Sequence, residues 1–116
     1  DCMFLSSHEP CSMCLSAITF SGFDNFYYLF PYEITNDQFS IPHDLKILKE
    51  VFKVDNGDYN KENSYWKSHN INMLIEELSS SKKEKFINQI KEIKKNYITL
   101  SNKYQLSKHE NFIPLK

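Results

Sequence analysis

The chain has 116 residues, which is the length of a single domain or less. Its composition, 41% hydrophobic and 15% aromatic, is sufficient for a packed core, so a globally disordered chain is not expected. The 14 basic residues nearly balance the 15 acidic ones, and all of them are lysines. Because paired hydrogen bonds to bases and phosphates are a property of arginine, a nucleic-acid partner is not expected.

The cysteine count and the hydropathy pattern indicate in which cellular compartment the protein is expected. Three cysteines are an odd number, and two of them are close together, which disfavours a secreted, disulfide-linked module and favours a reducing cytoplasm. No apolar run approaches the roughly 18 to 20 residues of a spanning helix, so no membrane partner is expected. The chain enters an apolar segment directly after Asp1, and we interpret it as the C-terminal portion of a longer domain.

The first part of the chain predicts a strand, a helix and a second strand: Cys2–Leu5, Ser12–Gly22 and Asn25–Phe30. We expect Gly22 to end the helix, since glycine tolerates a positive φ. Met13, Ala17 and Phe20 are expected to form part of its apolar side. Two nearly continuous apolar strands around a helix are typical of a parallel crossover buried on both faces, so the aromatic strand is expected in the core.

The segments after residue 30 carry weaker signals of secondary structure. Residues 31–42 predict a connection without regular structure, and the later segments predict a helix, a surface loop and a short helix: Asp44–Phe52, Val54–Ser64 and Ile71–Leu78. Tyr65 and Trp66 are expected to anchor the loop to the core.

The clearest helical pattern lies near the C-terminus. Ser81 and Glu84 match a capping box, and an apolar stripe follows with spacings of three and four: Phe86, Ile90, Ile93, Tyr97, Leu100 and Tyr104. We expect this helix to pack on its own domain, with a homodimer contact as the alternative, and we expect Lys82, Lys83, Lys94 and Lys95 to be solvated. The sequence therefore divides into residues 1–78 and a helical extension over 79–116.

The most specific motif is Pro10-Cys11-Ser12-Met13-Cys14, which lies between the first strand and the first helix. Two cysteines three residues apart on a first helical turn place both sulfurs on one side. The free N–H groups and the dipole of the helix N-terminus favour the thiolate, which is the form that binds zinc. A zinc site is the favoured interpretation, and a dithiol redox site or two buried structural cysteines are the alternatives.

The run Glu9-Pro10-Cys11-Ser12-Met13-Cys14-Leu15-Ser16-Ala17-Ile18 resembles the second zinc motif of the cytidine deaminase-like superfamily. The resemblance continues through Phe23–Tyr28, covers about residues 4–30, and is closest to guanine deaminases and tRNA adenosine deaminases. It implies a three-layer α/β/α sandwich, of which this chain is the C-terminal portion. It also implies one catalytic Zn²⁺, with Cys11 and Cys14 as two of its ligands.

The resemblance further implies residues that this sequence does not contain. The family's third ligand lies in an upstream H-x-E or C-x-E motif, whose Glu shuttles a proton between the zinc-bound water and the leaving ammonia. None of the four histidines and none of the cysteines in this chain begins such a motif. The catalytic residues are therefore unknown from this sequence, and a missing N-terminal segment of the same domain is the expected partner.

The residues just before the cysteine motif are further candidate site residues. Successive strand residues point to opposite faces, so His8 and Glu9 are not expected to act together as ligand and proton shuttle. Glu9 matches the family's Glu before Pro-Cys. His8 is expected to be a strand residue, and both are kept as candidate substrate-binding residues. His43, His69 and His109 are expected in loops or at helix starts, and Cys2 is expected to be a buried, inert thiol.

These observations predict the C-terminal part of a zinc-dependent hydrolytic deaminase that acts on a guanine- or cytosine-type nucleobase or nucleoside. A zinc-bound water would be the nucleophile, and a segment outside this chain would complete the site. A non-catalytic zinc-binding module and a thiol–disulfide oxidoreductase are the alternatives.

Overall fold

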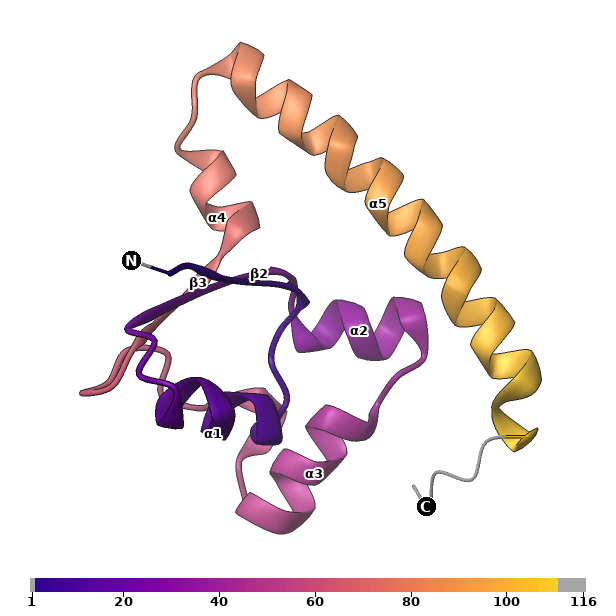
Figure 1. Cartoon of the computed structure of the whole chain (residues 1–116). Helices are drawn as coiled ribbons and strands as arrows, with labels where there is room; N and C mark the ends of the chain where they lie inside the picture. Colours follow the sequence, from indigo (N-terminus) through magenta and orange to yellow (C-terminus); the bar gives the residue numbers. More distant parts are fainter. Residues whose placement is uncertain (1, 111–116) are drawn as a thin grey trace.

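The structure is a computed structural model that describes residues 2–110. These residues form a mixed α/β fold with a small parallel sheet, five α-helices and two short 3₁₀ helices (Figure 1). In chain order the elements are β1 (Phe4–His8), α1 (Ser12–Phe20), β2 (Asn25–Phe30), α2 (Tyr32–Phe39), α3 (His43–Phe52), η1 (Asp55–Gly57), β3 (Lys67–Asn70), α4 (Ile71–Glu76), α5 (Ser80–Ser107) and η2 (Lys108–Glu110).

The sheet has the strand order β1-β2-β3, and both pairings are parallel. Phe4 pairs with Phe26 at the start of β1, and His8 pairs with Phe30 at its end. Parallel neighbours need a crossover connection, and α1 supplies it between β1 and β2. The predicted strand–helix–strand order is therefore confirmed. Figure 1 shows α1 and α3 on one side of the sheet and α4 and α5 on the other.

The central strand β2 supplies core residues to both faces, as the sequence predicted. Phe26 and Tyr28 point towards α1, where they pack with Ile18 and Trp66. Phe26 is 0% exposed and its ring lies 5.0 Å from that of Trp66 in an edge-on arrangement. An aromatic pair in this edge-on arrangement stabilises the fold beyond the free energy gained by burying the two rings.

A second cluster lies between the sheet, α2 and α5. Leu29 and Phe30 pack there with Phe39 of α2, and Tyr97 of α5 closes over them. The rings of Phe30 and Phe39 meet edge to face at 5.1 Å. α2 and α5 are therefore fixed to the carboxyl end of β2 by apolar contact.

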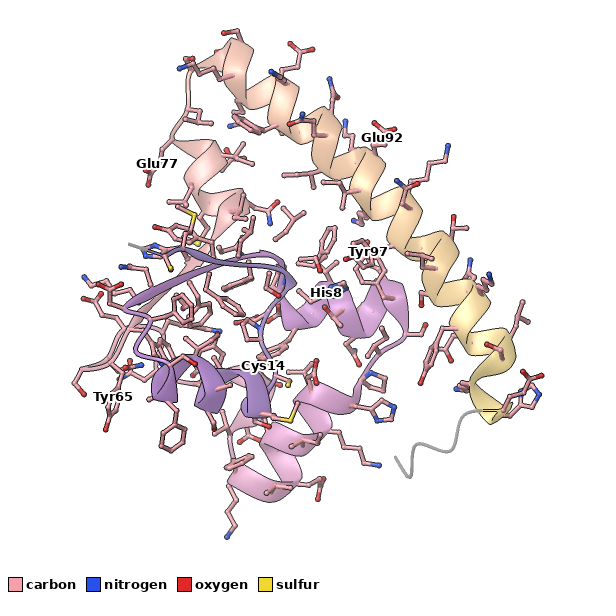
Figure 2. All side chains as sticks on the ribbon, in the orientation of Figure 1. His8, Cys14, Tyr65, Glu77, Glu92 and Tyr97 are labelled. Atoms are coloured by element: carbon pink, nitrogen blue, oxygen red, sulfur yellow. The ribbon has the colours of Figure 1, made fainter. Side chains whose placement is uncertain are left out.

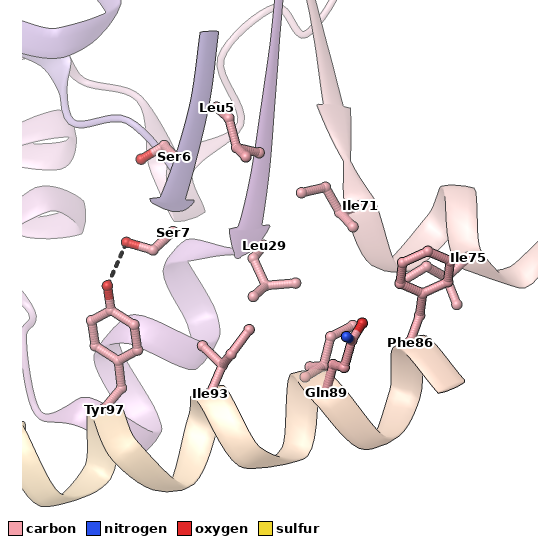
Figure 3. Close-up of a pocket in the computed structure, with 11 residues that line it drawn as sticks. Leu5, Ser6, Ser7, Leu29, Ile71, Ile75, Phe86, Gln89, Ile93 and Tyr97 are labelled. Carbon is pink, nitrogen blue, oxygen red and sulfur yellow. Dashed lines mark hydrogen bonds between the residues drawn. The ribbon is translucent and has the colours of Figure 1, made fainter. Parts of the chain in front are cut away.

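Helix α5 crosses the outer face of the sheet and leaves a cavity beneath it. Its Tyr97 hydroxyl donates to Ser7 Oγ at 2.8 Å, and its Ser101 hydroxyl donates to the Phe39 carbonyl. The cavity has a volume of about 450 Å³ and lies between the sheet, α4 and α5 (Figure 3). Although α5 is long, within residues 2–110 no helix combines the length and the apolar character needed to cross a bilayer.

The prediction of an irregular connection over residues 31–42 is wrong, because Tyr32–Phe39 is the helix α2. Most of its residues are polar, so the apolar pattern is short. Tyr32, Thr35 and Phe39 nevertheless recur at helical spacing and are all buried. Ser40 ends the helix with a left-handed φ of 55°.

Three smaller predictions also need correction. Met13, Ala17 and Phe20 lie on the exposed side of α1, and Ile18 is its buried residue. Tyr65 is exposed, so Trp66 alone of that pair anchors the loop. The capping box at Ser81 is absent, since α5 begins at Ser80 with Ser79 as its N-cap.

The strand β3 was not predicted, because Lys67-Ser68-His69-Asn70 has no apolar pattern. It forms by pairing with β2 and through side-chain contacts. The ring of His69 stacks on that of Tyr27 at 4.8 Å, and its Nε2 lies 2.9 Å from Asn25 Oδ1. The expectation that His69 lies in a loop or at a helix start is therefore wrong.

The burial of β2 gives a direct stability test. Phe26→Ala is expected to lower the free energy of unfolding by about 3–5 kcal/mol, because the cavity left at a fully buried ring is only partly filled. Phe20→Ala, at a side chain 93% exposed, is the matched control and should change it by less than about 0.5 kcal/mol. Urea unfolding followed by circular dichroism measures both, and equal effects would contradict this description of the core.

Candidate metal centre

The two cysteines of the predicted site lie at the N-terminus of α1. β1 ends at His8, and Glu9-Pro10 leads into Cys11, which is the N-cap residue with an extended backbone. The Cys11 carbonyl accepts the Leu15 N–H at 2.8 Å, which closes the first helical turn. Cys14 is the third helical residue, so both side chains belong to this turn, as the sequence predicted.

The two sulfurs lie close together. Cys11 Sγ and Cys14 Sγ are 3.4 Å apart, both residues are half-buried, and both thiols are free. A disulfide needs about 2.05 Å, so this is a reduced pair. Because zinc–thiolate bonds are about 2.3 Å long, sulfurs at this separation can both contact one ion. The residues present therefore fit two ligands of a zinc site.

The environment of Cys14 affects its protonation. Burial is the largest influence and raises the pKa of the Cys14 thiol, and the neighbouring Cys11 thiol raises it further. A backbone hydrogen bond at Cys11 lowers the pKa but does not compensate. The carboxylate of Asp44, at the start of α3, also raises it. On balance the pKa of the Cys14 thiol is raised, because burial and the neighbouring Cys11 outweigh the backbone hydrogen bond.

The described residues do not complete a metal site around the pair. Within residues 2–110, no group of three or more His, Cys, Asp or Glu side chains is arranged to hold a metal ion. Cys2 lies outside the pair, and it is exposed, so the prediction that it is buried is wrong. Cys11 and Cys14 are therefore two converging ligands without a third among the described residues.

Glu9 is buried directly beside the cysteine motif. Its carboxylate accepts hydrogen bonds from the Tyr32 backbone N–H at 3.0 Å and from the Tyr59 hydroxyl at 2.7 Å. It also forms an ion pair with Lys61. A buried carboxylate is stable only with such partners, and these three satisfy it.

His8 points towards α2 and α5, where it contacts Phe39 and Tyr97 (Figure 2). Its ring meets those of Phe30, Phe39 and Tyr97 edge to face at 4.7–5.4 Å. Nδ1 lies 3.1 Å from Ser7 Oγ, and Nε2 is buried with no hydrogen-bond partner in residues 2–110. Burial lowers the pKa of His8. The substrate contacts of His8 and Glu9 stay predictions, while the structure gives both side chains partners inside the fold.

The remaining histidines, His43 and His109, lie where the sequence predicted. His43 is the first residue of α3, which agrees with the predicted helix start. His109 is exposed in η2, as expected for a solvated residue.

Sequence reasoning missed the residues that hold Glu9. Tyr32, Tyr59 and Lys61 come from α2 and from the loop after η1, and nothing in their local sequence indicates a shared partner. The sequence did offer one indication of these partners, which is Glu9 itself. A carboxylate that is buried between an apolar strand and a proline requires hydrogen-bond donors from elsewhere in the chain.

The fold and the site together define an α/β protein with a paired-thiol site at the N-terminus of a crossover helix. Comparisons of the chain with family models, with curated proteins and with solved structures find no match in any of the three.

The packing of His8 predicts a pH-dependent stability. Its pKa in the folded protein lies below the ordinary 6.5, so between these two values the unfolded chain binds more protons. The free energy of unfolding is therefore expected to fall as the pH drops below 6.5, by roughly 1.4 kcal/mol for each unit between the two pKa values.

Urea unfolding at several pH values between 5 and 8 measures this. His8→Phe should flatten the dependence, because a phenyl ring fills the aromatic site and cannot be protonated. His109→Asn is the control, since His109 is exposed. An identical slope for His8→Phe and the original chain would contradict the prediction.

Proposed function

We propose that this chain is part of a zinc-dependent hydrolytic deaminase that acts on a nucleobase or nucleoside. The observation that carries the proposal is the convergence of Cys11 Sγ and Cys14 Sγ, 3.4 Å apart, on the first turn of α1. The two thiols would hold the zinc ion. Zinc held there would supply the Lewis acidity that makes a water molecule nucleophilic near neutral pH.

The order of the elements supports this proposal. The cysteine motif follows the strand β1 and opens the helix that leads to its parallel neighbour β2, as the resemblance to the deaminase superfamily implies. Helices lie on both sides of the small sheet (Figure 1), which is compatible with the proposed three-layer α/β/α sandwich. Within residues 2–110, β1 pairs with β2 alone, so its second edge has no strand paired to it.

A third zinc ligand and a proton-shuttling Glu would come from an H-x-E segment that these 116 residues do not contain. Such a segment could pair with the open edge of β1 and place its His and Glu near the cysteines. The proposed substrate is a guanine- or cytosine-type base or nucleoside, and the reaction is hydrolytic loss of its exocyclic amine as ammonia.

A non-catalytic zinc-binding module is the second candidate. It is favoured by the finding that the described residues bring only two potential ligands together. Metal analysis combined with an activity assay separates the two candidates, and thiol titration separates both from a thiol–disulfide oxidoreductase.

Metal binding tests the proposed ligands. The chain is expected to bind one Co²⁺ ion with the near-ultraviolet absorption of cobalt–thiolate bonds, and Zn²⁺ should displace it. Cys11→Ser and Cys14→Ser should each weaken zinc binding by more than roughly 100-fold, beyond the effect of residues that only support a ligand. Cys2→Ser is the control, since Cys2 is an exposed thiol outside the pair. One bound zinc ion per chain with no titration of Cys11 and Cys14 in the folded protein would rule out the redox alternative.

Activity tests the substrate class. Ammonia release is expected from at least one of guanine, guanosine, cytosine and cytidine when the protein is produced from its full reading frame. Cys11→Ser should abolish this release, because the zinc ion would lose a ligand, and Cys2→Ser should preserve it. Stoichiometric zinc without ammonia release from any of the four compounds would favour the non-catalytic module.

A further inference from the structure

A buried carboxylate lies immediately before the cysteine motif. The side chain of Glu9 is 2% exposed, and the next two residues along the chain are Pro10 and Cys11. Its backbone N–H continues the pairing of β1 with β2 by donating to the Phe30 carbonyl at 2.8 Å. Glu9 therefore fixes the point at which the chain leaves the sheet and enters the metal site.

Three of the donors to this carboxylate come from distant segments. Oε2 accepts the first free N–H of α2, from Tyr32, and Oε1 accepts the Tyr59 hydroxyl and the Lys61 ammonium. The Lys61 Nζ also lies 3.6 Å from the centre of the Tyr59 ring, which adds a cation–π contact. Both oxygens of Glu9 are thus engaged, and two of the three donors belong to one loop.

Tyr32 makes a second connection to the motif. Its hydroxyl donates to the Pro10 carbonyl, directly before Cys11. Its ring lies against Gly57, where an added Cβ would meet Tyr32 Cδ2 at 2.5 Å. Gly57 also has a φ of +68°, so a larger residue there would be strained and would displace the Tyr32 ring.

The loop that carries Tyr59 and Lys61 is itself anchored. The Lys61 carbonyl accepts the backbone N–H of Ser68 in β3 at 2.9 Å. Trp66 donates from Nε1 to Thr19 Oγ1, near the C-terminus of α1, at 2.8 Å. The loop therefore joins β3 to both ends of the helix whose first turn holds the thiols.

We propose that Tyr59 and Lys61 are positioning residues for the metal site. They act through Glu9 by holding the Glu9-Pro10 segment, which sets the direction of the first turn of α1 and so the placement of Cys11 Sγ and Cys14 Sγ. This inference rests on the proposed zinc-binding function. Groups hydrogen-bonded directly to metal ligands contribute roughly 10- to 100-fold to metal affinity, and residues that act one contact further away are expected at the lower end of that range.

The test measures Zn²⁺ affinity of the full chain by competition with a chelator, and the Co²⁺ spectrum of the same variants. Lys61→Met and Tyr59→Phe are each expected to weaken zinc binding by roughly tenfold, and to shift the cobalt–thiolate bands. Lys61→Arg keeps the cation and should restore affinity. Tyr59→Phe keeps the ring against Lys61 and removes only the hydroxyl bond to Glu9.

Lys67→Met is the matched control. Lys67 also forms an ion pair, with Glu62 at 2.5 Å, but both side chains are largely exposed and lie outside the Glu9 cluster. Its removal should leave zinc affinity and the cobalt spectrum unchanged. Circular dichroism confirms that each variant is folded, and if Lys61→Met does not fold, Tyr59→Phe and Lys61→Arg carry the test.

The outcomes separate this inference from the proposed function. If the original chain binds cobalt through both thiols and the folded Tyr59→Phe and Lys61→Met variants match it in affinity and spectrum, the inference is wrong and the zinc site stands. If the original chain shows no thiolate coordination, the proposed function itself is wrong and the inference falls with it.

Discussion

The burial of β2 on both faces is the constraint on which the rest of the structure depends. Phe26 and Tyr28 need a cover on one side of the sheet and Leu29 needs one on the other, because exposed aromatic and aliphatic surface costs free energy in water. α1 supplies the first cover, and α4 and α5 supply the second (Figure 1). Because α1 must lie over the sheet, its N-terminus and the two thiols are placed at the carboxyl ends of the strands.

The buried carboxylate of Glu9 connects this packing to the candidate site. An ionised group in the interior requires charge and hydrogen-bond partners, and Glu9 obtains them from α2 and from the loop after η1. The polar loop is thereby joined to the cysteine motif, and its apolar anchor Trp66 fixes it to the core. Glu9 thus stabilises the connection between α1 and α2, and it fixes the position at which the chain enters the thiol pair.

Whether a helix or strand could be predicted from the sequence depends on whether the contacts that stabilise it are local or come from distant segments. β1, α1, β2, α3 and α4 have apolar patterns or end signals within their own sequences, and all were predicted to within a few residues. α2 and β3 are mostly polar, and each is stabilised by partners elsewhere, namely the Glu9 carboxylate and the edge of β2. α5 was predicted from its stripe, but its start was misplaced, because the capping pattern at Ser81 falls inside a helix that begins at Ser80.

For the candidate site, the sequence by itself determined the thiol pair, since three-residue spacing on a helical turn is a local geometric property of Cys11 and Cys14. It also determined that His8 and Glu9 point to opposite sides, because strand side chains alternate. Only the tertiary structure decided what each side chain meets: aromatic rings around His8, three donors around Glu9, and burial that raises the pKa of Cys14. These environments depend on contacts between residues far apart in the sequence, such as the 89 positions between His8 and Tyr97, and such contacts exist only once the sheet has brought the segments together.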